Sequence, residues 1–370
     1  ALYVSREKPG HQKNTNDYFL AGNDLPWWAI GASLIAANIS AEQIIGMSGS
    51  GYVIGLGIAS YEWMSAITLI IVGKYMLPIF LKRKIFTMPQ FLEQRYDHRV
   101  KTTLAIFWLS VYVFVNLTAV LWLGALAINT ITGVQLEYGL VFLVVFAIVY
   151  SLYGGLKAVA LTDIVQVVLL VIGGSYLTYM SLDLLGNGNG AMSGFLHMTQ
   201  ELPDKFDMIL SPDSPHYANL PGISVLIGGM WVMNFSYWGF NQYIIQRTLA
   251  AKSLREGQKG IMMAAFLKLF MPLIVVVPGI AAIMLVPDLD RPDQAYPHLM
   301  SMMPEGFRGL VFAALIAAVV SSLGSMTNSI ATIFTMDLYS HHRPEKSQAH
   351  YVFIGRMVGL IALIVAMLTA

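Results

Sequence analysis

The sequence contains no cysteine and little charge. Its 370 residues include 22 Lys and Arg and 21 Asp and Glu, 12% in all, while 56% are hydrophobic. Soluble domains carry about 25% charged residues. The lack of cysteine excludes disulfides, thiolate metal sites and cysteine nucleophiles. The net charge of +1 provides no basic stripe for nucleic acid. The composition is typical of a polytopic membrane protein.

The sequence also lacks an initiator methionine, a signal peptide and a large polar domain. It opens with ALYVSREKPG, a short apolar tail followed by charges, and closes inside an apolar run at MLTA. We expect both ends to be cut, with a helix before Ala1 and others after Ala370. No loop of adequate size brings a nucleophile and a base together, so the sequence argues against an enzyme.

Apolar runs long enough to cross about 30 Å of hydrocarbon as helices recur along the whole chain. They lie at 26–52, 53–81, 101–131, 138–153, 157–185, 221–245, 260–286, 306–336 and 351–370. One set of alternating loops carries 17 Lys and Arg, Arg247 among them, and the other set carries 3. Because basic loops stay in the cytoplasm, we expect residues 1–25 to be cytoplasmic. The chain is predicted to be one all-α transmembrane domain over residues 1–370.

The first run is interrupted in its middle by Asn38, Ser40, Glu42 and Gln43. A charged group at mid-depth costs about 2.5 to 3.5 kcal/mol, which predicts a discontinuous helix. The sixth run repeats the triplet Asn38-Ile39-Ser40 as Asn234-Phe235-Ser236. Broken helices five apart are what an inverted repeat of five plus five helices predicts. We expect repeats at about 26–185 and 221–370, the second one incomplete.

Polar residues at depth indicate a binding site between the helices. Glu62 and Ser65 are three apart and share a helix face, where they suit a polyol. Glu62 could instead form a structural ion pair with Lys268, and Gln43 could contact a ligand or a neighbouring helix.

Two aromatic residues lie at the expected break of the sixth helix. Tyr237 and Trp238 precede Gly239 and Asn241, and their rings could stack on a sugar or serve only for packing.

A sodium site is a second possibility near the first break. Unwinding at Asn38 would free the carbonyls of Ala36 and Ile39. Ala318, Ser321 and Ser322 stand at i, i+3 and i+4 and share a helical stripe. These neutral oxygens suit Na⁺, although serine hydroxyls in membrane helices also bond to their own i−4 carbonyls.

Long stretches of the chain resemble the sodium/solute symporter family. They include TNDYFLAG, LPWWAIGASLIAANISAEQ, SYEWMSAIT, YGGLKAVALTDIVQ, YWGFNQYIIQRTLAAKS and AALIAAVVSSLGSMTNSIATIFTMDLY. The resemblance is strongest to the sodium/sugar members, of the sodium/galactose and sodium/glucose type, and covers nearly the whole chain. It implies a leucine-transporter-like fold and Na⁺-coupled hexose uptake by alternating access in a bacterial inner membrane.

The resemblance also implies roles for individual residues. Sugar contacts would be Gln43, Glu62, Ser65, Asn234 and Lys268, with Tyr237 as the stacking inner gate bonded to Asn38. Met47 and Tyr61 match the outer gate, and Trp238 and Asn241 match the inner lining. Na⁺ would bind at Ala36, Ile39, Ala318, Ser321 and Ser322, and Asp163 would lie on the ion's route to the cytoplasm.

The chain departs from the family pattern in places. Ser236 stands where the sugar symporters have a tyrosine, and Leu161 replaces a tryptophan. The family's tenth core helix, which contributes to the sugar site, falls beyond Ala370. A symporter for an amino acid, carboxylate or polyol, or a sugar-gated sensor or channel, also remains compatible with the sequence. The sugar, the oligomeric state and a role for Glu42 stay open.

Overall fold

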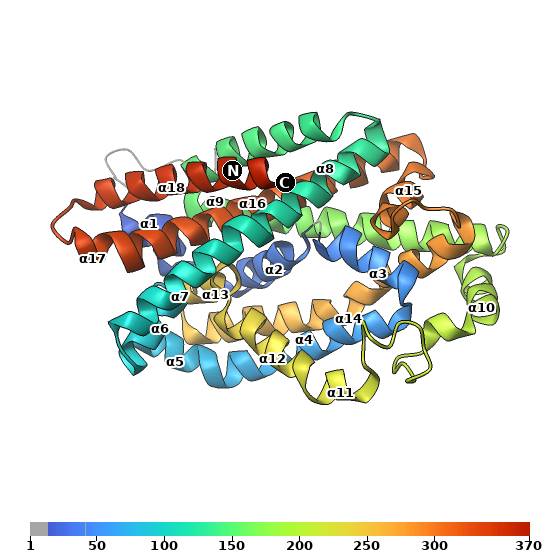
Figure 1. The fold of residues 1–370 in the computed structure, drawn as a ribbon, viewed down its shortest axis with the longest axis horizontal. Coiled ribbons are helices and arrows are strands. Elements are labelled where there is room, and N and C mark those ends of the chain that lie inside the picture. The colour runs from blue at the N-terminus through green and yellow to red at the C-terminus, as the bar shows by residue number, and fades with distance from the viewer. Residues whose placement is uncertain (1–13, 41) are drawn as a thin grey trace.

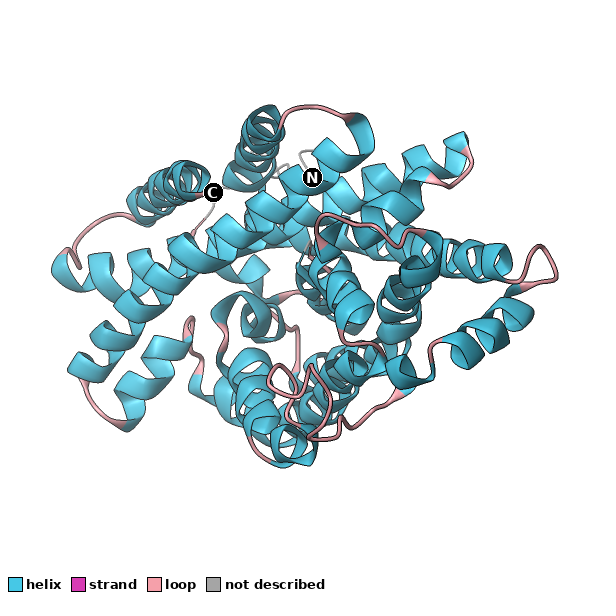
Figure 2. Cartoon of the chain, turned by 45° about the vertical axis from the view of Figure 1, so that its right-hand side comes forward, coloured by secondary structure: helices cyan, strands magenta, loops and turns pink. Residues whose placement is uncertain are grey.

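The described part of the chain is built from helices alone. The computed structural model describes residues 14–40 and 42–370, with the side chains of 150–154 and 158 excepted. Within these ranges no strand is present (Figure 2), and the only β-type pairing is an isolated bridge between Leu25 and Ala251. The long helices run roughly along the long axis of the molecule (Figure 1). This arrangement confirms the predicted all-α class.

The first half of the chain ends in a long, kinked helix. Its α-helices are α1 (Thr15–Leu20), α2 (Trp27–Asn38), α3 (Met47–Val53), α4 (Ser60–Ile71), α5 (Leu77–Arg83), α6 (Met88–Arg95), α7 (His98–Val111), α8 (Thr118–Thr132) and α9 (Leu136–Leu185). Gly155, with φ of 65°, marks a kink inside α9, because this backbone conformation suits glycine. Short π-helical turns join α4 to α5 and α7 to α8, so each of these pairs forms one continuous rod.

The second half contains three long helices and several short ones. Its α-helices are α10 (Ala191–Glu201), α11 (Gly222–Ile227), α12 (Gly229–Phe235), α13 (Gln242–Leu249), α14 (Leu254–Leu285), α15 (Ala295–Ser301), α16 (Glu305–Ile333), α17 (Ser340–His342) and α18 (Gln348–Thr369). The connector at 186–220 contains α10. A π-helical turn continues α16 into α17.

The structure agrees with most of the predicted spans. Six helices within the described ranges are long and apolar enough to cross a membrane, and α2 with Glu42–Val53 adds a seventh as a bent pair. The run at 138–153 lies in the part of α9 before its kink at Gly155, and the stretch of it whose side chains are described, Leu136–Val149, is apolar. The run at 221–245 is divided among α11, α12 and α13, so no single rod is present there.

The long helices α14 and α16 form the centre of the bundle. α16 packs along α9, and α14 packs against α2, α3 and α4. The contact of α2 with α14 is close because both helices present glycine. A β-carbon on Gly260 would lie 2.7 Å from Ile30, and one on Gly31 would lie 2.9 Å from the carbonyl of Gly260. Small residues at such crossings let membrane helices approach through their backbones.

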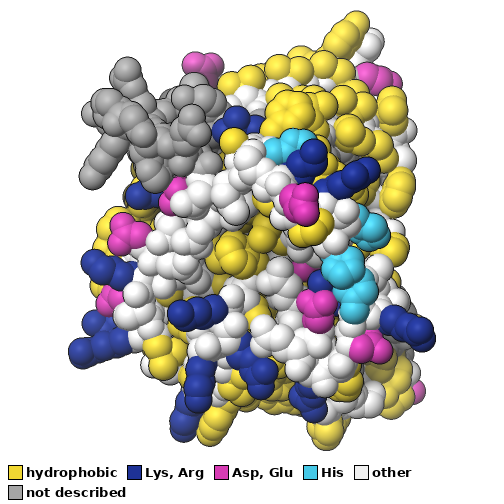
Figure 3. Space-filling model, turned by 90° about the vertical axis from the view of Figure 1, so that its left-hand side faces the viewer, with side chains coloured by type: hydrophobic (Ala, Val, Ile, Leu, Met, Phe, Trp, Pro, Cys, Tyr) yellow, Lys and Arg dark blue, Asp and Glu magenta, His cyan; other side chains and the backbone are white. Residues whose placement is uncertain are grey.

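Exposed positive charge gathers at the end of the molecule that carries α5, α6 and α17 (Figure 3). The exposed basic residues there are Lys82, Arg83, Lys84, Arg95, Arg99, Lys252, Arg255, Lys259, Arg343 and Lys346. This clustering follows the predicted loop asymmetry, except that two of the counted charges are buried. They are Arg247, which is fully buried, and Lys101, which pairs with Glu93.

The connector at 186–220 is fixed to the joint between α3 and α4. Lys205 Nζ donates to the carbonyl of Val53 at 2.5 Å. Burial lowers the pKa of Lys205 below its ordinary value, against the attraction of Asp204. Gly55 has φ of 97°, and a β-carbon on it would lie 2.3 Å from the carbonyl of Lys205. Only glycine fits this contact.

Candidate functional site

The first apolar run is broken where its polar residues lie. α2 ends at Asn38, and Ile39 has φ of −74° and ψ of 69°. Ser40 N donates to the carbonyl of Asn38 at 2.8 Å, two residues back rather than the four of a helix. The chain resumes as the π-helical turn Glu42–Gly46 and α3, bent by 59° from α2. The predicted discontinuity is therefore present.

The sixth apolar run is broken as well. α12 ends at Phe235 and continues as the π-helical turn Ser236–Phe240. Asn241 then leaves helical geometry with ψ of 121°, and α13 begins at Gln242. The triplet of the first run thus lies at its break, whereas the triplet of the sixth run lies at the junction of α12 with the π-helical turn, five residues before the break at Asn241.

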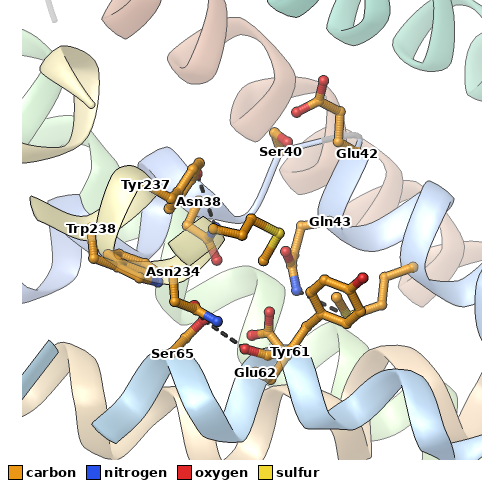
Figure 4. Close-up of a pocket in the computed structure, with 12 residues that line it drawn as sticks. Asn38, Ser40, Glu42, Gln43, Tyr61, Glu62, Ser65, Asn234, Tyr237 and Trp238 are labelled. Atoms are coloured by element: carbon orange, nitrogen blue, oxygen red, sulfur yellow. Dashed lines mark hydrogen bonds between the residues drawn. The ribbon is translucent and has the colours of Figure 1, made fainter. Parts of the chain in front are cut away.

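A polar cavity of about 210 Å³ lies between the two breaks and α4. It is lined by Asn38, Ser40, Glu42, Gln43, Met47, Tyr61, Glu62, Ser65, Met233, Asn234, Tyr237 and Trp238 (Figure 4). All twelve belong to the first, second and sixth apolar runs, and ten of them are polar or aromatic. The cavity collects nearly all residues that the sequence assigned to a sugar site or its gates.

Lys268 lies behind the cavity wall rather than in it. Its ammonium group is 2.6 Å from Glu62 Oε2, also donates to Asn38 Oδ1, and lies 5.1 Å from the centre of the Trp238 ring. A buried charge needs partners of this kind. Lys268 therefore joins residues of all three runs and fixes the Glu62 carboxylate at the cavity.

Tyr237 is held by hydrogen bonds on two sides. Its hydroxyl accepts from Asn38 Nδ2 at 3.1 Å and from Tyr243 OH at 2.9 Å. The first bond is the predicted one between Asn38 and Tyr237, and the second links Tyr237 to α13. Asn241 does not line the cavity, because its Oδ1 accepts instead from Tyr112 OH at 2.7 Å.

The other side of the cavity contains the residues assigned to the outer gate. Gln43 Nε2 lies 3.3 Å from Met47 Sδ, and Tyr61 lies beside them (Figure 4). Ser65 Oγ is 2.7 Å from Asn234 Oδ1, which couples the second run to the sixth. The carboxyl group of Glu42 points away from these residues (Figure 4).

The residues assigned to Na⁺ are all buried, where α2 and α16 pack together. Ser322 Oγ is buried and has no hydrogen-bond partner among the described residues. The deviation of Ser40 N toward Asn38 leaves the carbonyl of Ala36 outside the regular helical pattern. An orphaned hydroxyl and a carbonyl outside the helical pattern fit a small hard cation. Within the described ranges no group of three His, Asp or Glu residues forms a metal centre.

Asp163 is bonded to Ser321, one of the residues assigned to Na⁺, and has a partner that the sequence did not predict. Its carboxylate accepts from Ser33 Oγ at 2.6 Å and from Ser321 Oγ, and lies 3.7 Å from Arg247. The Arg247 guanidinium also donates to Ser33 Oγ at 2.6 Å and to Ser325 Oγ. A lone buried Asp in a membrane helix is a signal for a buried base, and it could have pointed to Arg247.

A helical bundle with two interrupted membrane helices around a polar cavity is the architecture of a secondary transporter. The model of the sodium:solute symporter family matches residues 18–370. The chain therefore belongs to the sodium:solute symporter family.

Individual relatives support the same placement. Over its whole length the chain is 57% identical to a sodium/glucose cotransporter of Vibrio parahaemolyticus, of which it spans 71%. Over 95% of its length it is 34% identical to a sodium/myo-inositol cotransporter 2 of Sus scrofa, of which it spans 56%. A solved Na⁺-coupled sialic acid symporter, in a substrate-bound outward-open state, superposes on 99% of the chain and 77% of that protein with a TM-score of 0.87 and 25% identity.

Proposed function

We propose that this chain carries the core of a Na⁺-coupled sugar symporter that takes up a hexose of the glucose or galactose type by alternating access. The carrying observation is the cavity in which the Glu62 carboxylate, held by Lys268, faces the amides of Gln43 and Asn234. Carboxylate and amide groups both bind sugar hydroxyls. The name of the Vibrio relative agrees with this substrate class.

Each assigned residue receives a role in this proposal. Gln43, Glu62, Ser65 and Asn234 bind sugar hydroxyls, and Lys268 positions Glu62. Tyr237 stacks on the sugar and closes the cytoplasmic side, with Asn38 holding its hydroxyl. Met47 and Tyr61 cover the outer side, and Trp238 and Asn241 support the inner side.

Na⁺ is the second transported species. It binds to the carbonyls of Ala36, Ile39 and Ala318 and to the hydroxyls of Ser321 and Ser322, and so ties α2 to α16. Asp163 receives the ion on its way to the cytoplasm. Because Na⁺ fixes the end of α2 next to Asn38, ion and sugar stabilise the same state, and their coupling is reciprocal.

The membrane placement follows from the same proposal. The two repeats are 26–185 and 221–370, residues 1–25 face the cytoplasm, and the membrane is a bacterial inner membrane. The protein moves its substrates without changing them chemically, so it is not an enzyme.

A polyol is the second candidate substrate. Relatives named as sodium/myo-inositol cotransporters are 33–34% identical to the chain, and a cyclic polyol presents the same hydroxyl groups as a hexose. This alternative changes the solute and keeps the site.

Uptake by the purified protein in liposomes tests the proposal. Labelled glucose, galactose, myo-inositol, proline and acetate are offered under an inward Na⁺ gradient and under a matched K⁺ gradient. We expect accumulation of a hexose with Na⁺ only. Na⁺-driven uptake of proline or acetate alone, or hexose entry that ignores the gradient, would contradict the proposal.

A further inference from the structure

A buried cluster of hydrogen bonds lies at the start of α13, after Tyr237 in the chain, and its central residue is Gln242. This glutamine is the first residue of α13, directly after the break in the sixth apolar run, and its side chain is fully buried. A buried primary amide needs partners for both its nitrogen and its oxygen. The partners of Gln242 all lie in other parts of the fold.

The side chain of Gln242 is bonded to the backbone between α5 and α6. Its Nε2 donates to the carbonyl of Phe86, and its Oε1 accepts from the N–H of Met88, each at 2.9 Å. This pair of bonds imitates the pairing of one β-strand with another. The amide therefore fastens α13 to the connector at 84–87 and to the first residue of α6, which follow the rod of α4 and α5.

The backbone of Gln242 is fastened to a third element. Its N–H donates to Tyr112 OH at 2.9 Å, and the same hydroxyl donates to Asn241 Oδ1 at 2.7 Å. Tyr112 is fully buried in the rod formed by α7 and α8. One tyrosine hydroxyl thus satisfies the first free N–H of α13 and fixes the side chain at the break.

The same connector is bonded to the cytoplasmic part of the α16 rod. Thr87, the N-cap of α6, donates from its hydroxyl to Asp337 Oδ1 at 2.8 Å, and both residues are fully buried. The elements that meet around Gln242 are therefore α13, the α5–α6 connector, the α7–α8 rod and the α16 rod. Tyr237 is bonded to this group through Tyr243 OH, six residues further along its own run.

We propose that Gln242 is a positioning residue that clasps the inner half of the sixth helix shut beneath Tyr237, and that this clasp opens when the cavity opens to the cytoplasm. The inference rests on the proposed function only in that it assumes alternating access. The clasp forms a second closed layer, because Tyr237 cannot move toward the cytoplasm while Tyr243 and the start of α13 are held. Its release requires three hydrogen bonds of one residue to break together.

Cysteine accessibility tests the clasp, because the chain has no cysteine of its own. A single reporter, Ser40→Cys, places a thiol in the cavity wall. Inside-out membrane vesicles expose the cytoplasmic face to a membrane-impermeant maleimide, and the labelling rate is measured without sugar or Na⁺. Gln242→Met keeps the length of the side chain and removes both amide bonds. We expect it to raise the labelling rate about tenfold.

A matched control has the same substitution elsewhere. Gln258 Nε2 donates to the carbonyl of Gly73 at 3.1 Å, away from the breaks. Gln258→Met should leave the labelling rate within about twofold, since its bond does not involve α13. Equal rates in the reporter protein and in a folded Gln242→Met variant would overturn the proposal.

If Gln242→Met does not fold, Thr87→Val tests the same clasp without changing the sixth helix. Thr87→Val removes the bond to Asp337 and should raise the labelling rate, whereas Thr87→Ser keeps the hydroxyl and should not. Unchanged labelling in Thr87→Val would then overturn the proposal. Labelling requires no transported solute, so failure of the uptake test and failure of the clasp are separate results.

Discussion

Two buried ion pairs lie within one bundle and differ in what surrounds them. Glu62 and Lys268 touch at 2.6 Å, and Glu62 faces the cavity. Asp163 and Arg247 stand 3.7 Å apart, away from the cavity wall, with the hydroxyl of Ser33 bonded to both. The Glu62–Lys268 pair is in direct contact and borders the cavity, whereas the Asp163–Arg247 pair is surrounded by serine hydroxyls.

The different surroundings of the two ion pairs indicate different roles, one in binding the solute and the other in binding the ion. A carboxylate at a cavity wall can exchange water for sugar hydroxyls while its lysine partner keeps the charge balanced. A carboxylate that reaches Ser321 through a hydrogen bond acts next to the assigned cation position and has no access to the sugar. We infer that the Glu62 pair governs solute binding and the Asp163 pair governs Na⁺.

The largest expected effect on stability and uptake comes from breaking the Glu62–Lys268 ion pair. Lys268→Met leaves the buried Glu62 carboxylate without its cation, which costs about 3 to 5 kcal/mol. We expect a clear drop in the melting temperature of the purified protein and loss of uptake. Lys74→Met, at an exposed position of the second run, should change neither.

A double variant refines this result. Glu62→Gln with Lys268→Met removes both charges, so part of the lost stability should return while uptake stays absent. If uptake returned as well, the carboxylate would not be needed for the solute.

A smaller effect, limited to the Na⁺ dependence of sugar binding, is expected from a change in the Asp163–Arg247 pair. Asp163→Asn removes the negative charge near Ser321 and Arg247 while keeping the side-chain shape. We expect the Na⁺ concentration for half-maximal sugar binding to rise about tenfold, equal to about 1.4 kcal/mol, with sugar affinity unchanged at saturating Na⁺. Asp183→Asn, near the end of α9 and before the connector at 186–220, is the control. A change in sugar affinity without a change in Na⁺ dependence would reverse the assignment.

The smallest expected effect is a difference in the free energy of unfolding between variants of two serines on α16. Ser325 Oγ accepts from Arg247, whereas Ser322 Oγ has no partner among the described residues. Without Na⁺, Ser325→Ala should lower the free energy of unfolding by about 1 to 2 kcal/mol, and Ser322→Ala should change it little. Thermal unfolding in K⁺ buffer measures both. Equal losses would show that Ser322 also has a structural bond.

Much of the fold and of the cavity could be predicted because its signals are local. A charged group such as Glu42 is costly at mid-depth, and this cost, with the polar residues Asn38 and Gln43 beside it, indicated the break in the first run. The triplet at Asn234 indicated the second break. The residues around the cavity came from the resemblance to the sodium/solute symporter family, and the structure brings nearly all of them together.

Long-range partners could not be predicted from local patterns. Arg247 lies in the segment QRTLAAKS, whose basic residues and spacing are typical of a cytoplasmic loop. It is buried because Asp163, Ser33 and Ser325 on three other helices satisfy its guanidinium. Gln242 is a similar case, since its partners at Phe86 and Met88 are more than 150 residues away.

The account depends most on Na⁺ at Ser322 shaping the sugar site, and sugar binding by calorimetry tests this directly. Dissociation constants for the transported sugar are measured in Na⁺ and in K⁺, for the unaltered protein and for Ser322→Ala. Na⁺ should tighten binding at least about tenfold in the unaltered protein, and the ratio should fall to about one in Ser322→Ala. A ratio that survives in a folded Ser322→Ala protein would contradict the account.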